Sequence, residues 1–138
     1  MGTTRASSEF RASPDFIRGR SGEKRVAALL QRRGWWVVPS YEYAGEDGDK
    51  APKLQGRHAA YVIPDLDVSK EGRRRWVEVK TKARADYTHI TQRLEHGIPL
   101  RHWDAYRSVQ AITGCPVYLF ICEDDTGAIL FKSIDELD

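Results

Sequence analysis

Apolar residues recur every three or four positions in two segments of the chain. The first segment covers residues 21–33, where Ser21 is placed to cap the start of a helix and Gly34 to end it. The second covers residues 100–113 and stops at Gly114. A period of three to four is typical of an amphipathic helix, so we expect one helix in each segment.

Short apolar runs rich in β-branched and aromatic residues predict five strands. They cover residues 35–38, 60–68, 75–81, 117–122 and 128–132. The order of elements is therefore one helix, three strands, one helix and two strands. This order predicts an α/β fold in which helices flank a mixed sheet of four to five strands.

Three segments show neither the helical period nor an apolar run typical of a strand. Residues 1–20 contain Ser, Thr, Arg and Pro with scattered apolar positions, which predicts a flexible N-terminal arm before a single domain over 21–138. Residues 40–58 are rich in Gly, Asp and Lys, and we expect a long loop there. Residues 85–98 are polar with interspersed aromatics and receive no assignment.

Length and composition then exclude several classes of protein. With 138 residues, of which 41% are hydrophobic and 30% charged, the chain is typical of one soluble globular domain. No apolar run approaches the roughly 18–20 residues of a membrane helix, and no signal sequence is visible. The two cysteines match no zinc spacing and favour buried thiols in a reducing compartment. We therefore expect a cytoplasmic protein that does not contact a membrane.

The net charge of +2 conceals an uneven distribution of charged residues. Residues 1–34 carry eight Lys and Arg against three acids, and residues 69–84 carry seven against two. Residues 123–138 carry six acids and a single lysine. Basic charge gathered in two segments indicates either a polyanionic partner or a solvated basic face.

Charged side chains lie inside two predicted strands that are otherwise apolar. Because strand side chains alternate in direction, Glu78 and Lys80 share a face with Trp76, and Asp65 shares a face with Asp67. Such charges are costly to bury unless something pairs them. A divalent cation such as Mg²⁺ suits Asp65 and Glu78, because it prefers carboxylate oxygens. The alternative is a salt bridge between Glu78 and Lys80 on an exposed face.

These acids also form part of a recognisable pattern. Pro64-Asp65, followed after twelve intervening residues by Glu78-Val79-Lys80 in an apolar strand, resembles the PD-(D/E)xK nuclease superfamily. The resemblance implies the restriction-endonuclease-like fold.

The first predicted helix extends this resemblance upstream. Gly22-Glu23, an apolar stripe and then Gly34-Trp35 are similar to the opening of the archaeal-type Holliday junction resolvases, so the pattern covers roughly residues 21–122. The long segment 40–58 departs from the resolvases and is similar to insertions in small phage and prokaryotic nucleases. Specificity for junctions is therefore not carried over.

The resemblance implies a DNA endonuclease that needs Mg²⁺, with Mn²⁺ as a substitute. Whether it selects a DNA structure, such as a junction, flap or nick, stays open. The resemblance also implies that Asp65, Glu78 and the Val79 carbonyl bind the metal, while Lys80 orients the attacking water or stabilises the developing charge. Glu23 contacts the metal through water in this interpretation, although it could instead stabilise the helix N-terminus. A homodimer is also implied, since small relatives often dimerise.

Further residues are candidates for contacts with DNA, or alternatively belong to solvated turns and loops. They are Arg73, Arg74, Arg75, Lys82, Arg84, Gln92 and Arg93. Asp67 is either a second acid of the site or a solvated group at a strand end, and Gln110 could lie near the metal. The four tryptophans are predicted to belong to the core rather than to stack on bases. They are Trp35, Trp36, Trp76 and Trp103.

Two other functions stay open. A nucleic-acid-binding module of the same fold would bind in a salt-sensitive way, without metal dependence and without cleavage. A nuclease directed at RNA would use the same residues on another substrate. The complete set of Asp65, Glu78 and Lys80 favours a nuclease over a silent module.

Overall fold

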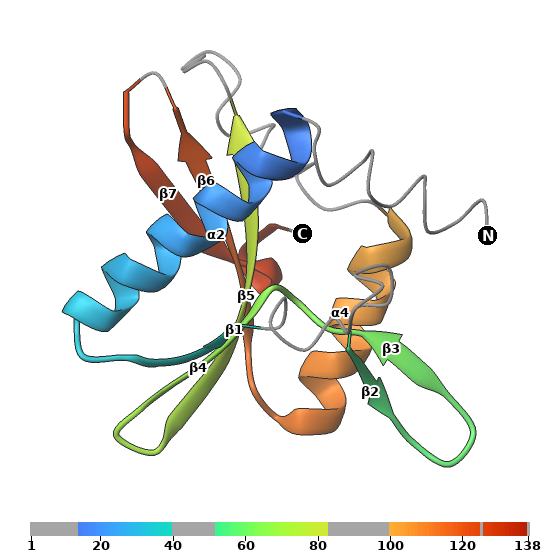
Figure 1. The fold of residues 1–138 in the computed structure, drawn as a ribbon. Coiled ribbons are helices and arrows are strands. Elements are labelled where there is room, and N and C mark those ends of the chain that lie inside the picture. Colours follow the sequence, from blue (N-terminus) through green and yellow to red (C-terminus); the bar gives the residue numbers. More distant parts are fainter. Residues whose placement is uncertain (1–13, 40–51, 83–99, 125, 138) are drawn as a thin grey trace.

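A mixed sheet in the order β1-β4-β5-β6-β7 forms the centre of the protein (Figure 1). The structure, a computed structural model, describes residues 14–39, 52–82, 100–124 and 126–137. The sheet strands are β1 (Trp36–Pro39), β4 (Leu66–Lys70), β5 (Arg73–Lys82), β6 (Val117–Glu123) and β7 (Ile129–Ser133). Only β5 and β6 pair in parallel, and the other neighbours are antiparallel. The predicted α/β class with a mixed sheet is confirmed.

Two α-helices of the described residues pack on opposite faces of this sheet. Helix α2 (Pro14–Arg32) buries Val26 and Leu30 against Val77 of β5 and its neighbours. Helix α4 (Leu100–Thr113) buries Val109 against the other face, where Trp76 lies. Burying each such apolar side chain contributes roughly 1.5–3 kcal/mol. The alternation of Trp76 and Val77 between the two clusters confirms the predicted faces of β5.

Helix α2 is longer than the sequence pattern suggests. It begins at Pro14, so Ser21 lies within the helix and its predicted role as the cap is wrong. Proline is well suited to the first turn of a helix, because its fixed φ is helical and its missing N–H has no partner there. The predicted end is confirmed: Gly34 adopts a φ of 90°, and the Trp35 N–H donates to the Leu30 carbonyl at 3.0 Å.

The expected strand over 60–68 is wrong, because it is divided in two. Strand β3 (Ala60–Val62) leaves the main sheet and pairs with β2 (Lys53–Gln55), and β4 starts afresh at Leu66. The expected loop over 40–58 is therefore wrong where β2 forms, and residues 40–51 lie outside the described residues. Leu54 and Tyr61 of this small hairpin pack against the apolar cluster around Trp76 and Val109. Because these residues are far apart in sequence, the local pattern does not show the contact.

The remaining elements follow the predicted order. A two-residue turn with positive φ at Glu71 and Gly72 joins β4 to β5, the geometry that suits a tight hairpin. A short helix, η3 (Ile134–Leu137), follows β7 and buries Ile134 against α4 and β6. Neither α2 nor α4, the helices that the structure describes, combines the length and the hydropathy needed to cross a bilayer.

We predict that Gly34→Ala lowers the free energy of unfolding by about 1–2 kcal/mol, because an L-residue in this left-handed conformation is strained. Urea denaturation of the two proteins gives the difference. Gly56→Ala is the matched control, since a Cβ at Gly56 meets only the Ala59 carbonyl oxygen at 3.6 Å. Equal costs at the two positions would contradict the prediction.

Candidate active site

The site lies where β4 and β5 stop pairing. The last pair of their ladder is Leu66 and Val77, and Pro64, just before β4, has no N–H to continue it. The Asp65 side chain takes the place of the missing strand, because its Oδ2 accepts a hydrogen bond from the Val79 N–H at 2.8 Å. This bond holds the Asp65 carboxylate at the edge of β5, beside Glu78.

Glu78 points from β5 toward α4 and is buried. Burial raises the pKa of Glu78 well above its ordinary value, the negative charge of Asp65 raises it further, and the Lys80 ammonium and the Tyr106 hydroxyl oppose the shift. The Lys80 Nζ lies 3.6 Å from the Glu78 Oε2 and keeps about a third of its side chain exposed. Lys80 therefore connects a buried acid to the protein surface.

Glu23 reaches the same place from α2. Burial and the negative charge of Asp65 raise the pKa of Glu23 to about 8, while Arg20 and Lys80 act in the opposite direction. The Arg20 Nε lies 3.6 Å from the Glu23 Oε2. Asp65 thus interacts with both glutamates, and the three carboxylates converge from α2, β5 and the segment before β4.

The carboxylates converge only because α2 approaches β5 closely at Gly22. A Cβ at Gly22 would overlap the Thr81 Oγ1 and lie 3.6 Å from the Val79 Cγ1. Gly22 immediately precedes Glu23, so this tight contact between helix and strand lies next to the residue whose side chain extends to Asp65. The Gly22-Glu23 pair of the sequence has a physical reason in this packing.

The donor chemistry of the site suits a hard cation. The Glu23 Oε2 and the Glu78 Oε1 are both buried without a hydrogen-bond partner. Buried acceptors of this kind are rare unless a water or an ion satisfies them, and carboxylate oxygens are the ligands that Mg²⁺ prefers. Within the described residues, no group of three or more His, Cys, Asp or Glu side chains has the geometry of a formed metal centre. The residue types of the site fit a divalent cation.

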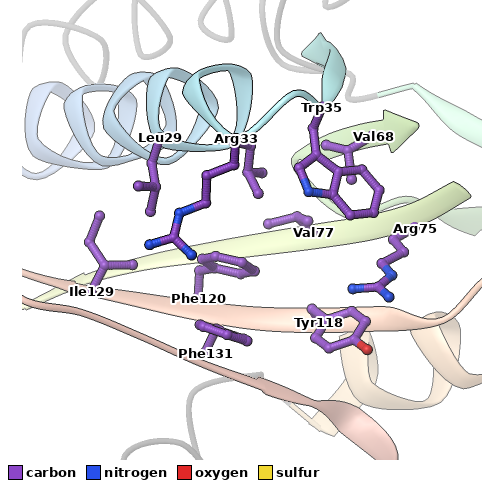
Figure 2. Close-up of a pocket in the computed structure, with 11 residues that line it drawn as sticks. Leu29, Arg33, Trp35, Val68, Arg75, Val77, Tyr118, Phe120, Ile129 and Phe131 are labelled. Atoms are coloured by element: carbon purple, nitrogen blue, oxygen red, sulfur yellow. The ribbon is translucent and has the colours of Figure 1, made fainter. Parts of the chain in front are cut away.

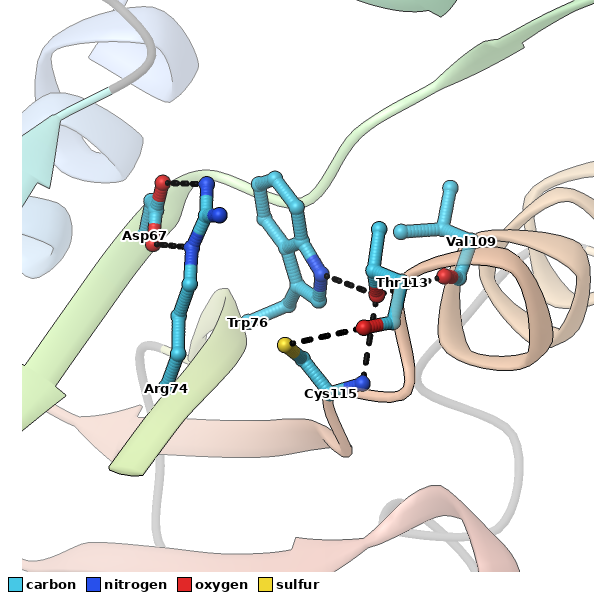
Figure 3. A network of polar contacts seen from close by, with 6 residues as sticks. All are labelled: Asp67, Arg74, Trp76, Val109, Thr113 and Cys115. Atoms are coloured by element: carbon cyan, nitrogen blue, oxygen red, sulfur yellow. Dashed lines mark hydrogen bonds and ion pairs between the residues drawn. The ribbon is translucent and has the colours of Figure 1, made fainter. Parts of the chain in front are cut away.

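Asp67 does not join the acids. It forms a two-pronged ion pair with Arg74, whose Nε and Nη2 lie 2.9 and 2.6 Å from the two carboxylate oxygens (Figure 3). The Arg74 guanidinium also lies 5.2 Å from the centre of the Trp76 ring. Asp67 was expected to be either a second acid of the site or a solvated group at a strand end. The structure favours a position outside the site, where Asp67 is paired with Arg74.

The same network anchors α4. The Trp76 Nε1 donates to the Thr113 Oγ1 at 3.1 Å, and that hydroxyl donates to the Val109 carbonyl at 2.7 Å (Figure 3). These bonds tie the last turn of α4 to β5 two residues before Glu78. Tyr106, one to two turns earlier on α4, is thereby held against Glu78.

Gln110 has a structural role instead of a place near the acids. Its Oε1 accepts from the Val117 N–H and its Nε2 donates to Asp135, both at 2.9 Å. Gln110 thus joins α4 to the start of β6 and to η3. The hypothesis that it lies near the metal is not supported.

The basic residues at the start of β5 separate from one another. Arg73 is exposed at the turn, Arg74 is engaged by Asp67, and Arg75 lies on the α2 face between the rings of Trp35 and Tyr118. They do not form one surface beside Glu78. The side chain of Lys82 and the residues Arg84, Gln92 and Arg93 lie outside the described residues.

Tyr106 is the contributor to the site that sequence reasoning missed. Burial and the charges of Glu78 and Asp65 raise the pKa of Tyr106, so its hydroxyl stays protonated beside Glu78. In the sequence Tyr106 reads as one more position of an amphipathic stripe. Its only distinguishing signal is that a polar aromatic occupies the buried face.

Comparison with known proteins shows the fold. No family model matches the sequence, and no curated protein matches it. Among solved structures, the chain is similar to Hjc, a Holliday junction resolvase from the archaeal hyperthermophile Archaeoglobus fulgidus, with a TM-score of 0.55 and 13% identity. The match covers 85% of this chain and 78% of that chain. The protein therefore has the restriction-endonuclease-like fold that the sequence pattern implied.

We predict that Gly22→Ala lowers the free energy of unfolding by about 1–3 kcal/mol, because the added methyl group overlaps Thr81. Thr81→Ala removes the obstructing hydroxyl, so the double variant should lose less than the sum of the two single losses. Urea denaturation of the four proteins completes this cycle. Strictly additive losses would show that Gly22 is not packed against Thr81.

We also predict that, in EDTA, stability falls as the pH rises from about 4.5 through about 8. The folded state raises the pKa of Glu23 and Glu78, so it retains protons that the unfolded chain releases, and a higher pH favours the unfolded chain. The slope of the free energy of unfolding against pH approaches about 1.4 kcal/mol per pH unit for each proton retained. Glu23→Gln should reduce this slope, because the glutamine side chain cannot ionise. Glu136→Gln, in exposed η3, is the control, and a slope unaffected by Glu23→Gln would refute the assignment.

Proposed function

We propose that this protein is a metal-dependent nuclease that hydrolyses phosphodiester bonds within DNA, leaving 5′-phosphate and 3′-hydroxyl ends. The observation that carries the proposal is the meeting of Glu23, Asp65 and Glu78 beside Lys80 on the restriction-endonuclease-like sheet. Mg²⁺ is the proposed cation and Mn²⁺ a substitute. A homodimer and a cytoplasmic location are expected but rest on the sequence alone.

Three groups are proposed to bind the cation directly. Asp65 and Glu78 offer carboxylates that already lie side by side, and the Val79 carbonyl is the proposed third ligand, on the same residue whose N–H orients Asp65. Glu23, with a buried oxygen that lacks a hydrogen-bond partner, would contact the cation through water. When bound, the cation lowers the pKa of a water molecule and offsets the charge of the phosphate.

The protein side chains have separate tasks in this mechanism. Lys80 combines a partly exposed ammonium with a 3.6 Å contact to Glu78, so it can orient the attacking water or stabilise the charge that develops on the phosphate. Tyr106 keeps a protonated hydroxyl against Glu78 and restricts the orientation of that carboxylate. Asp65 is held by the Val79 N–H before any ligand arrives, which reduces the reorganisation that binding requires.

Contacts with the DNA backbone are assigned to the basic residues near β5. Arg73 is exposed at the β4–β5 turn and available to a phosphate. Lys82, the last residue of β5, and the residues Arg84, Gln92 and Arg93 that follow the strand in sequence are proposed to extend this contact. Arg74 is the least available of these residues for a contact with DNA, because its guanidinium already binds the Asp67 carboxylate.

The test is cleavage of labelled duplex, single strand, flap and four-way junction in Mg²⁺, Mn²⁺ or EDTA. We expect cation-dependent cleavage by the wild type and a loss of at least about 100-fold in Glu78→Gln and Lys80→Ala, a typical effect of removing a group that assists the transition state. Asp67→Asn is the matched control, since this acid lies on the same sheet face but is paired with Arg74.

Each contrary result has a defined meaning. A wild type that binds the panel without cutting it in either cation would identify a silent binding module. Preference for RNA over DNA of the same sequence would identify an RNA-directed nuclease. Cleavage that survives both substitutions would place the active site elsewhere.

A further inference from the structure

An aromatic cavity of about 180 Å³ lies on the α2 face of the sheet (Figure 2). Tyr106 packs on the opposite face, with Trp76. The C-terminal half of α2 forms one wall, Trp35 forms another, and the floor consists of side chains from β4, β5, β6 and β7. The side chains that matter for its chemistry are Arg33, Trp35, Arg75, Tyr118, Phe120 and Phe131. Neither the catalytic residues nor their supports line it.

The cavity exists because α2 is too short to cover the whole face. The helix ends at Arg32, and Gly34 turns the chain away toward β1. Phe131 of β7 consequently remains 60% exposed, and its ring stacks on Phe120 with the ring centres 5.1 Å apart and an interplanar angle of 16°. Two stacked rings at the edge of an open cavity offer a flat surface to a third planar group.

Two guanidinium groups accompany these rings. Arg33, the residue directly after α2, extends across the cavity toward β6 (Figure 2). The Arg75 guanidinium lies 5.1 Å from the centre of the Trp35 ring and 4.9 Å from that of Tyr118. Aromatic contacts leave the N–H donors in the guanidinium plane available. Neither arginine forms an ion pair with an acid in the part of the chain that the structure describes.

A ligand for this cavity must therefore be planar and carry negative charge. We propose that the cavity binds an unpaired nucleobase of a DNA strand, stacked on Phe131, with a neighbouring phosphate on Arg33 and Arg75. Stacking on aromatic side chains combined with basic groups is how proteins bind single-stranded nucleic acid. The inference rests on the proposed function and defines its substrate class as DNA with unpaired nucleotides.

The charge of the cavity argues against a second copy of the chain as its occupant. None of the residues that line it is acidic. A two-fold interface centred there would bring the arginines of both copies together in an apolar setting, with no carboxylate among the lining residues to compensate them. A polyanion supplies that compensation.

The position of the cavity also suits a strand that reaches the catalytic acids. Glu23 lies nine residues before Arg32, the last residue of α2, which corresponds to about 14 Å at 1.5 Å per residue, and Arg33 follows Arg32 directly. A few nucleotides span such a distance. The cavity can therefore hold an unpaired nucleotide near the position of cleavage.

The test compares the affinity for a labelled duplex with that for the same duplex carrying a six-nucleotide single-stranded extension, in EDTA and at fixed salt. Fluorescence anisotropy should show that the wild type prefers the extended duplex by about tenfold, within the range of stacking contributions. Arg33→Ala and Phe131→Ala should each reduce the ratio of the two affinities toward one. Both positions are exposed, and thermal melts establish that the variants fold.

Two variants provide matched controls. Arg32→Ala removes a neighbouring exposed arginine of α2 that does not line the cavity, and Trp36→Ala removes an aromatic that is 79% exposed outside it. Both should keep the preference of the wild type. If the arginines act only by general attraction to phosphates, Arg32→Ala will lower the preference for the extended duplex as much as Arg33→Ala does. That result would overturn the proposal.

Other outcomes also overturn it. These are a wild type without preference, a dimer by light scattering that Phe131→Ala dissociates, or a free deoxynucleoside monophosphate that binds as tightly as the extended duplex. Failure here is distinguishable from failure of the nuclease proposal. Cleavage that depends on Glu78, without any preference for the extended duplex, contradicts only the proposal that the cavity binds a nucleobase. The predicted preference without cleavage supports that proposal and contradicts the nuclease activity.

Discussion

The hydrogen bond from the Val79 N–H to the Asp65 carboxylate is the interaction on which the candidate site depends. A proline ends the β4–β5 ladder, and an edge of β5 would otherwise be left without a partner. Asp65 supplies that partner with a side chain, so an acidic group is fixed where a backbone carbonyl would normally lie. Glu78, the residue before Val79, is then beside Asp65 whatever else the chain does, and the electrostatics of the site follow from this one constraint.

Acids gathered in this way destabilise the protein, and the surrounding structure offsets the cost. The raised pKa values of Glu23 and Glu78 show that their ionised forms are disfavoured by burial and by Asp65. Two packed helices nevertheless hold the groups in place, α2 through the close contact at Gly22 and α4 through the bond between Trp76 and Thr113. A structure that maintains unfavourable charge at one point is typical of a functional site. The same reasoning favours a cation there, since it would remove the repulsion.

The two faces of the sheet have different chemistry, and β5 connects them. Its alternate side chains send Glu78 and Lys80 toward α4, and Val77 and Arg75 toward α2. A single strand thus contributes both to the acidic site and to the aromatic cavity. The arginines that look like one basic run in the sequence serve opposite faces, because side-chain direction reverses at every residue of a strand. Charge density along the chain was therefore a poor guide to charge density on the surface.

The sequence by itself determined the helix over 100–113, the strands β5 and β6 and the end of α2 at Gly34, because these depend on local periodicity and on one residue with positive φ. Its resemblance to the PD-(D/E)xK nucleases also indicated a group of Asp65, Glu78 and Lys80, and the resemblance of its first helix to the resolvases added Glu23. The division of the 60–68 strand, the early start of α2 and the exposure of Trp36 followed from tertiary packing and strand pairing. Only the tertiary structure placed Tyr106 against Glu78, paired Asp67 with Arg74 and opened the cavity beside Phe131. Each of these depends on contacts between residues distant in sequence, which no local pattern records.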